Sequence, residues 1–210
     1  MTFFEPREKQ TVVLLSGYSG SGKTTLAGYL ARNYGFTQVL AEDFHQERMR
    51  ELKMARQDYY EWRATRATEE ELRELRNQGV QFIKRNAQAK KVVVDWLNHP
   101  EELEEIRKKF PGSKILVVSL QTNKLTRMAS RLARRRQRTS GKMPLLKHII
   151  LGLRAEKLLR KGRLGAIPEI AAQADFSVTR LPKPFSKTAY AHVDRIMTEL
   201  GIEKTKTEKV

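Results

Sequence analysis

Short apolar runs recur along the chain, and amphipathic stretches with helical spacing separate them. Apolar, β-branched runs bounded by polar residues are typical of strands that are buried on both faces. Parallel strands of this kind are connected through helices that cover the sheet. We therefore predict an α/β fold with a five-stranded parallel sheet and helices on both faces. The strands are expected at residues 11–16, 36–41, 91–95, 114–120 and, in a less apolar run, 174–179.

The stretches between these runs predict helices. Thr68 stands at an N-cap position, because three glutamates follow it where the positive end of a helix dipole favours acids. Pro100, followed by two glutamates, marks a second helix start. Ser186 is expected to cap the last helix, which ends before Gly201. The remaining helices are expected at residues 25–33, 44–60, 125–138 and 144–161.

The residues after the first predicted strand carry the sharpest motif in the chain. Residues 17–24 fit the spacing G-x-x-x-x-G-K-[ST] of a phosphate-binding loop, between a strand and a helix as that loop requires. Its glycines can adopt positive φ, Lys23 can contact the β- and γ-phosphates, and the Thr24 hydroxyl can ligate Mg²⁺. We predict that ATP and Mg²⁺ bind here, with ATP held by Gly17, Tyr18, Ser19, Gly20, Ser21, Gly22, Lys23, Thr24 and Thr25.

Two acidic residues follow predicted strands at the sheet edge where open α/β folds bind ligands. Asp95 ends an apolar strand and is the candidate to organise Mg²⁺ together with Thr24, although turn and cap aspartates also occur there. Asp43 is the candidate general base for a hydroxyl acceptor. Glu42 could serve equally, and Asp43 could instead cap a helix. We interpret His45 and His99 as ordinary surface or capping residues.

Composition excludes several classes of protein. The chain has no cysteine, so it can form no disulfide, iron–sulfur cluster or cysteine zinc site. No apolar run approaches ~18 residues, and the first residues lack a signal-peptide pattern, so we expect no membrane partner. At 210 residues the chain is expected to be a single domain, 1–210. These features predict a cytoplasmic protein, in the host cytoplasm if it is viral, and leave the oligomeric state open.

The positive charge is concentrated in one segment. The formal net charge is +17, and residues 121–165 hold 14 Lys and Arg against a single acid. Arg131 and Arg135 are predicted to clamp the transferring phosphoryl group, and both are assigned a catalytic role with Lys23 and Asp43. One ATP cannot occupy all of these cations. The surplus forms either a solvated face or a track for the nucleic-acid backbone.

This order of features resembles the nucleoside-monophosphate-kinase-like P-loop kinases, especially dephospho-coenzyme A kinases, archaeal adenylate-kinase-like proteins and phage deoxynucleotide kinases. The resemblance implies an acceptor-binding insertion near residues 44–90 and a basic helical lid near 121–165 that closes on ATP. The segment 121–165 is longer and more basic than such a lid needs. The similarity is carried by the phosphate loop, Asp43 and residues 92–95, 101–107, 127–138 and 172–176.

The sequence thus predicts an ATP-dependent kinase that transfers the γ-phosphoryl group to a nucleotide-type acceptor. The favoured acceptor is a hydroxyl on a nucleotide within DNA, as in phage enzymes that phosphorylate 5-hydroxymethyl-deoxyuridine and modify DNA. The alternative is a free (deoxy)nucleoside monophosphate or dephospho-coenzyme A. A non-catalytic module that binds a nucleotide and nucleic acid is a third reading. The presence of Lys23, Thr24 and Asp95 disfavours it.

Overall fold

The computed structural model describes residues 9–138, 165–180 and 187–205. The predicted helix at 144–161 and its basic residues lie outside these ranges, as does the predicted cap Ser186. Within the described part of the chain, no helix is both long and apolar enough to cross a bilayer.

Five parallel strands form one sheet in the order β2-β3-β1-β4-β5, which confirms the predicted fold class. β1 lies in the middle, and Val13 pairs with Val93 on one side and with Leu116 on the other. Because all neighbouring strands are parallel, each connection must run back along one face of the sheet before the next strand begins. The strands are β1 (Thr11–Ser16), β2 (Thr37–Val39), β3 (Lys91–Val94), β4 (Lys114–Thr122) and β5 (Phe176–Arg180).

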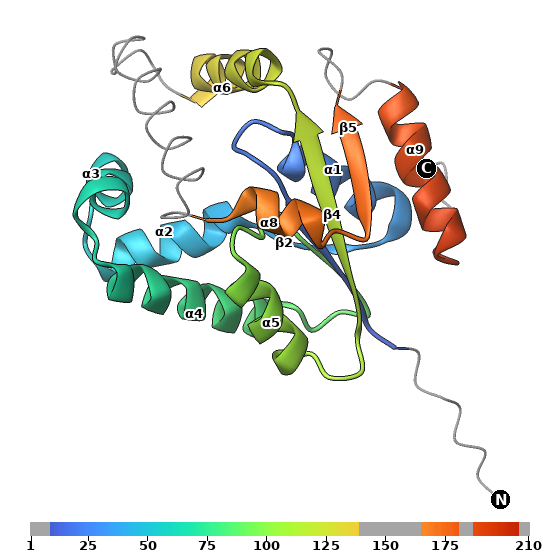
Figure 1. The fold of residues 1–210 in the computed structure, drawn as a ribbon, viewed down its shortest axis with the longest axis horizontal. Coiled ribbons are helices and arrows are strands. Elements are labelled where there is room, and N and C mark those ends of the chain that lie inside the picture. The colour runs from blue at the N-terminus through green and yellow to red at the C-terminus, as the bar shows by residue number, and fades with distance from the viewer. Residues whose placement is uncertain (1–8, 139–164, 181–186, 206–210) are drawn as a thin grey trace, which may run out of the picture.

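Helices cover both faces of the sheet (Figure 1). Val13 and Leu15 of β1 pack in a core with α1 (Lys23–Tyr34) and α9 (Lys187–Glu199). Val12 and Leu14 face the opposite core, which holds the apolar side chains of α4 (Glu69–Asn86), α5 (Pro100–Lys109) and α8 (Ile167–Ala172). Because both faces are covered, β1 is apolar at consecutive positions instead of alternating with polar residues.

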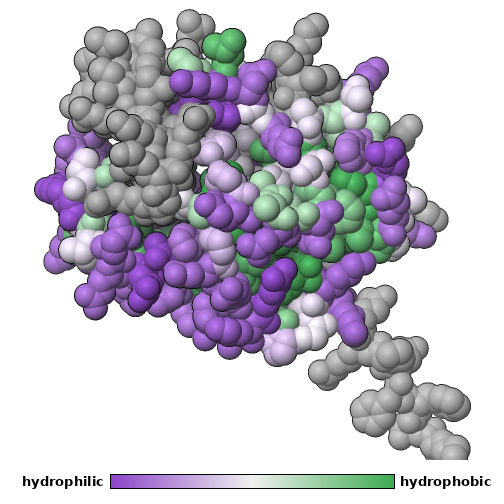
Figure 2. Space-filling model, viewed as in Figure 1, coloured by the Kyte–Doolittle hydropathy of each residue, from purple (hydrophilic) through white to green (hydrophobic). Residues whose placement is uncertain are grey.

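Two helix starts form as the sequence predicts. The Thr68 hydroxyl accepts a hydrogen bond from the Glu71 N–H, and the Glu71 carboxylate accepts one from the Thr68 N–H. At α5, His99 Nδ1 accepts a hydrogen bond from the Glu101 N–H, and the Glu102 carboxylate accepts one from the His99 N–H, which confirms the predicted capping role of His99. Figure 2 shows hydrophilic side chains along the lower edge of the molecule, where α4 and α5 turn their polar faces outward.

The segment after β2 differs from its prediction. The second strand is shorter than expected, because the Ala41 N–H donates to the Asp95 carboxylate and α2 (Ala41–Glu51) begins at once. The single helix predicted at 44–60 is divided. α2 stops before Lys53, whose φ of 52° is left-handed, and the chain continues as α3 (Arg56–Glu61) and the π-helical turn η1 (Trp62–Arg66). The break was not predicted, because position 53 is a lysine and not the glycine that usually marks a left-handed residue. The short helix α8 was not predicted either.

The last described helix is attached to the helix of the phosphate loop. Asp194 of α9 accepts hydrogen bonds from the hydroxyls of Tyr29 (2.6 Å) and Tyr34 (2.7 Å) of α1. Lys204 donates to the second oxygen of the same carboxylate at 2.7 Å. Tyr29 also stacks on Tyr190, with ring centroids 4.1 Å apart. These contacts hold α1 against α9, away from the phosphate loop at the N-terminal end of α1.

Candidate active site

The predicted phosphate loop connects β1 to α1. Gly17, Gly20 and Gly22 have φ values of 140°, 88° and 104°, and Gly22 is the N-cap of α1. A Cβ on Gly20 would lie 2.7 Å from the carbonyl oxygen of Arg127. Glycine is therefore required there both by backbone conformation and by space. The arrangement places backbone N–H groups of the loop and the positive end of α1 at one site, which suits an anion.

Lys23 lies over the same loop. Its ammonium donates to the carbonyl oxygen of Gly17 at 2.5 Å and contacts that of Tyr18 at 3.4 Å. These are contacts to neutral acceptors, and phosphate oxygens would form stronger, charge-assisted bonds with the same group. The lysine is thus already within the loop to which the β- and γ-phosphates are predicted to bind.

Thr24 and Asp95 meet beside the loop. The Thr24 hydroxyl donates to Asp95 Oδ2 at 2.7 Å, and the other carboxylate oxygen accepts from the Ala41 N–H at 2.6 Å. Asp95 is only 5% exposed. The structure therefore brings together the two residues predicted to organise Mg²⁺. Within the described ranges no three His, Asp or Glu side chains cluster as a metal site, so a Mg²⁺ ion here would need phosphate oxygens and water to complete its shell.

Asp43 and Glu42 differ in their surroundings. Glu42 binds Arg56 through both carboxylate oxygens, with an Oε2–Nη2 distance of 3.1 Å for one of the two bonds. Asp43 is exposed in the first turn of α2, and its carboxylate forms no hydrogen bond or ion pair with the described residues. The N-cap of α2 is Leu40, so Asp43 does not cap this helix.

The predicted arginines of the basic segment separate into different environments. Arg127, in α6 (Lys124–Arg138), is buried, stacks over the Tyr18 ring at 4.8 Å and donates to the Thr122 carbonyl oxygen. It therefore packs on the phosphate loop and is no part of an exposed face. Arg131 is half-buried on the same helix. The side chain of Arg135 lies outside the described residues.

A pocket opens next to this site, beyond the carboxyl end of β3. Its wall is aromatic, because Phe44 and Trp96 are nearly parallel, with ring centroids 6.1 Å apart and an interplanar angle of 11°. Trp96 directly follows Asp95, so the pocket begins one residue from the Thr24–Asp95 contact. The space is about 40 Å³, enough for a few water molecules. The lining residues are Phe44, His45, Arg63, Leu72, Leu75, Arg76, Gly79, Trp96, Asn98 and Glu102.

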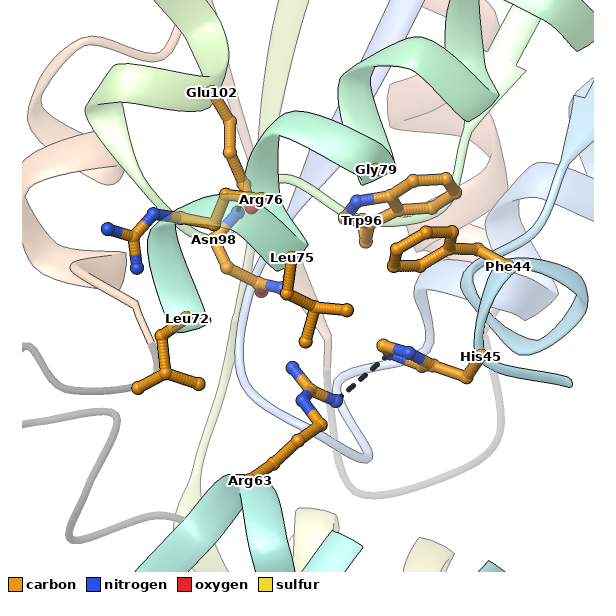
Figure 3. A pocket seen from close by; sticks show the side chains of 10 residues that line it. All are labelled: Phe44, His45, Arg63, Leu72, Leu75, Arg76, Gly79, Trp96, Asn98 and Glu102. Atoms are coloured by element: carbon orange, nitrogen blue, oxygen red, sulfur yellow. Dashed lines mark hydrogen bonds between the residues drawn. The ribbon is translucent and has the colours of Figure 1, made fainter. Parts of the chain in front are cut away.

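Polar groups enter the pocket from several elements (Figure 3). Arg63 extends from η1 toward His45 of α2, with 3.2 Å between Arg63 Nη1 and His45 Nε2. Asn98 lies on the opposite wall. Its backbone N–H donates to Glu102, a buried carboxylate whose pKa burial raises despite two such N–H bonds. Arg76 points away from the aromatic pair and pairs with Glu101 at 3.4 Å.

The prediction for His45 was wrong. It is neither a surface residue nor a cap, since its ring lies between Tyr59 and Arg63 inside the pocket. Arg63, Trp96 and Asn98 were also missed as site residues. Trp96 and Asn98 could have been found, because they continue the strand end that carries Asp95. Arg63 lies in a polar stretch with no periodic signal that distinguishes it from its neighbours.

Comparison with known proteins gives one family and several solved structures. The model of the AAA domain family matches residues 13–144. A shikimate kinase from Bacteroides thetaiotaomicron superposes with a TM-score of 0.54 at 16% identity, over 91% of this chain and 98% of that chain. A shikimate kinase from Acinetobacter baumannii, in complex with shikimate, gives 0.53 at 16% identity, over 91% and 96%.

A gluconokinase from Sinorhizobium meliloti 1021 gives a TM-score of 0.50 at 17% identity, over 93% of this chain and 98% of that chain. At such identities the similarity establishes the shared fold, so the predicted P-loop kinase fold is confirmed. The likeness to nucleoside-monophosphate-kinase-like groups stays a prediction. No curated protein matches the sequence.

Proposed function

Because the chain belongs to the AAA domain family, and has the fold of the kinases named above, we propose that it is an ATP-dependent kinase acting on a hydroxyl group. The carrying observation is the contact between Thr24 and Asp95, 2.7 Å long, which lies between the phosphate loop and the pocket. A donor site and an acceptor site then share one edge of the sheet, as transfer of a phosphoryl group requires.

Different residues around the loop would bind different parts of ATP and its Mg²⁺. The N–H groups of the loop and the start of α1 would bind the phosphates, and Lys23 would exchange its loop carbonyls for the β- and γ-phosphate oxygens. Thr24 and Asp95 would hold Mg²⁺, directly or through water. When bound, Mg²⁺ neutralises the charge of the phosphates. Arg131 and Arg135 are proposed to stabilise the charge on the transferring group.

Asp43 is proposed as the general base. As the acceptor oxygen bonds to the γ-phosphorus, the bond from that phosphorus to the oxygen of ADP breaks. The hydroxyl proton passes to the Asp43 carboxylate. The exposure of Asp43 and its lack of an ion-pair partner among the described residues support this role. The neighbouring carboxylate of Glu42 is instead paired with Arg56.

At about 40 Å³ the pocket can hold only part of an acceptor, and its lining favours one that carries both an anionic group and an apolar or planar part. Arg63 uses one of its five donors on His45, and within the described ranges its buried Nε has no hydrogen-bond partner. The Phe44–Trp96 wall offers a flat apolar surface. A nucleotide has this combination, and so, less fully, do the acids after which the neighbouring kinases are named.

A nucleotide within DNA is the second candidate acceptor. The observation that favours it is the charge of residues 121–165, with 14 cations against one acid. A segment of one sign gives affinity for a polyphosphate backbone whatever its sequence. Residues 139–164 of this segment lie outside the described residues, so the proposal rests on the charge of the segment.

Phosphoryl transfer from labelled ATP to a panel of acceptors tests both candidates. The panel contains nucleoside monophosphates, dephospho-coenzyme A, shikimate, gluconate, plain DNA and hydroxymethylated DNA. Lys23→Ala should reduce turnover on any positive acceptor by about 10²–10³, because one charge partner of the transition state is lost. Lys84→Ala, an exposed lysine of α4, should leave turnover unchanged. Normal turnover by Lys23→Ala would refute the kinase assignment.

A further inference from the structure

His45 connects three elements around the acceptor pocket. It lies on α2, and its Nδ1 is 3.0 Å from the hydroxyl of Tyr59 on α3. Its Nε2 is 3.2 Å from Nη1 of Arg63 on η1 (dashed line in Figure 3). A single imidazole thus joins the helix that carries Asp43 to the arginine that faces the pocket.

The chemistry of these partners fixes the form of the ring. A guanidinium can only donate, so the Nε2 beside Arg63 must be the nitrogen that carries the lone pair. The proton of a neutral imidazole is then on Nδ1, where it donates to the Tyr59 oxygen. A protonated ring would point an N–H at the guanidinium and lose this contact. The geometry is therefore consistent with one tautomer of the neutral ring.

Arg63 has otherwise little to define its orientation. Its guanidinium carbon lies 5.7 Å from the centre of the Tyr59 ring and 6.0 Å from that of Tyr60. Such contacts hold a cation over a ring face but leave it free to turn in its plane. The hydrogen bond that Arg63 donates to His45 Nε2 fixes the rotation of the guanidinium in its plane. The π-helical turn that carries Arg63 is also a feature often found at functional sites.

We propose that His45 is a positioning residue, which as a neutral Nδ1–H imidazole orients Arg63 toward the anionic group of the acceptor. This inference rests on the proposed function, because it assigns Arg63 to the acceptor of that reaction. His45 touches neither phosphoryl group. Its effect passes through Arg63 and should appear in acceptor binding rather than in the chemical step.

The surroundings of His45 keep it neutral. Burial, then the charges of Arg63 and Arg56, lower the pKa of His45 well below its ordinary value. A lowered pKa means that the ring stays unprotonated through the neutral range, and becomes charged only in acid. The charged and titratable groups that face the ring or the same pocket are Arg63, Arg56, Tyr59, Tyr60, Arg76 and Glu102.

The tautomer can be measured in the full-length protein without any acceptor. Long-range ¹H–¹⁵N spectra distinguish Nδ1–H from Nε2–H rings, and the His45 signals are identified by their loss in His45→Gln. We expect an Nδ1–H ring that remains neutral at pH 6, where an ordinary histidine is largely protonated. An Nε2–H ring, or a charged ring at pH 6, would overturn the proposal.

Kinetics with the best acceptor of the panel tests the role. In His45→Gln the amide oxygen can occupy the place of Nε2, whereas in His45→Asn it reaches only the place of Nδ1. His45→Asn should raise the KM for the acceptor about 10–100-fold, as expected for a lost hydrogen bond to a charged group. His45→Gln should recover most of this loss. In both variants the KM for ATP and the acceptor-free hydrolysis of ATP should stay within about twofold.

The outcomes separate this inference from the proposed function. If no acceptor is phosphorylated by the unmodified protein, the proposed function fails, and the positioning role fails with it whatever the NMR shows. If turnover is observed but Gln and Asn variants behave alike, or kcat falls with an unchanged KM, the kinase stands and the role of His45 is refuted. If both variants lose thermal stability, Tyr59→Phe provides the further test of the role of His45. That variant keeps the ring under Arg63 but removes the partner of Nδ1, and it should also raise the acceptor KM.

Discussion

Adjacent acidic side chains can have different roles when one of them is already paired. Glu42 and Asp43 both follow β2, and the sequence offers no basis for choosing between them as a base. The structure shows Glu42 bound by Arg56 through both oxygens and Asp43 exposed without an ion-pair partner among the described residues. A carboxylate that must accept a proton acts best when no cation stabilises its charge.

Asp43→Asn is expected to lower turnover on a hydroxyl acceptor by about 10²–10⁴ and leave ATP affinity unchanged, because the amide cannot accept the proton. Glu42→Gln, the matched control, should change turnover far less. Initial rates and ATP titrations measure both effects. A small loss confined to acceptor KM would indicate a phosphate acceptor, which is already a nucleophile. A lower Tm with normal kinetics would make Asp43 a structural residue.

Local signals explain which residues could be predicted. The phosphate loop was recognisable because its glycines, Lys23 and Thr24 are consecutive, and Asp95 because it ends an apolar strand. His45 and Arg63 could not be predicted, since 18 positions separate them and they meet only after the chain has turned between α2 and α3. That turn depends on Lys53 in a left-handed conformation, which sequence patterns assign to glycine or asparagine.

At the scale of elements, α4 forms one wall of the pocket and contains a glycine in its interior. Gly79 is buried, and a Cβ there would lie 3.7 Å from the Phe44 ring and 3.9 Å from the indole nitrogen of Trp96. These are ordinary contact distances, so an added methyl group would fit the folded protein. Glycine inside a helix costs stability relative to alanine. The glycine therefore leaves space in the pocket at the expense of the helix.

Gly79→Ala is expected to raise the stability of the protein by about 0.5–1 kcal/mol, by the difference in helix propensity. The methyl group should also crowd the acceptor, at a cost of about 1–3 kcal/mol, so its KM should rise about 5–100-fold. Thermal unfolding and acceptor titration measure the two changes. Asn77→Ala, exposed on the same helix, should stabilise without affecting KM. An unchanged KM in Gly79→Ala would place the acceptor elsewhere.

At the scale of the whole molecule, the positive charge is concentrated in residues 121–165, and this favours a nucleic-acid partner. Binding to a nucleic-acid backbone should weaken with salt, with log K against log[salt] falling by about 0.7–0.9 per phosphate neutralised. Changing Lys157, Arg160, Lys161 and Arg163 to Gln should flatten this slope and leave acceptor-free ATP hydrolysis unchanged. Fluorescence anisotropy with labelled DNA at several salt concentrations provides the measurement.

The control for this experiment removes the same number of cations from another part of the chain. Lys53, Arg73, Lys84 and Lys108 are exposed on the described body of the protein, and changing them to Gln should leave the slope nearly as it was. If both sets flatten it equally, the affinity reflects the net charge and no localised track. If DNA does not bind even at low salt while a free nucleotide is phosphorylated rapidly, the small-molecule acceptor is correct.

The central position of β1 has a consequence for the growing chain on the ribosome. Thr11 pairs with Lys91 on one side and with Lys114 on the other, so the eight residues of the phosphate loop emerge long before either neighbour of their strand. At about 5–20 residues per second, roughly 5–20 s pass before β4 has been synthesised. Until β3 (Lys91–Val94) has been added, β1 is an apolar segment without either of its strand partners, and it still lacks the second partner until β4 is complete. We therefore expect ATP to stabilise the finished fold rather than to nucleate it, because β1 lacks its second neighbour until residue 122 has been added.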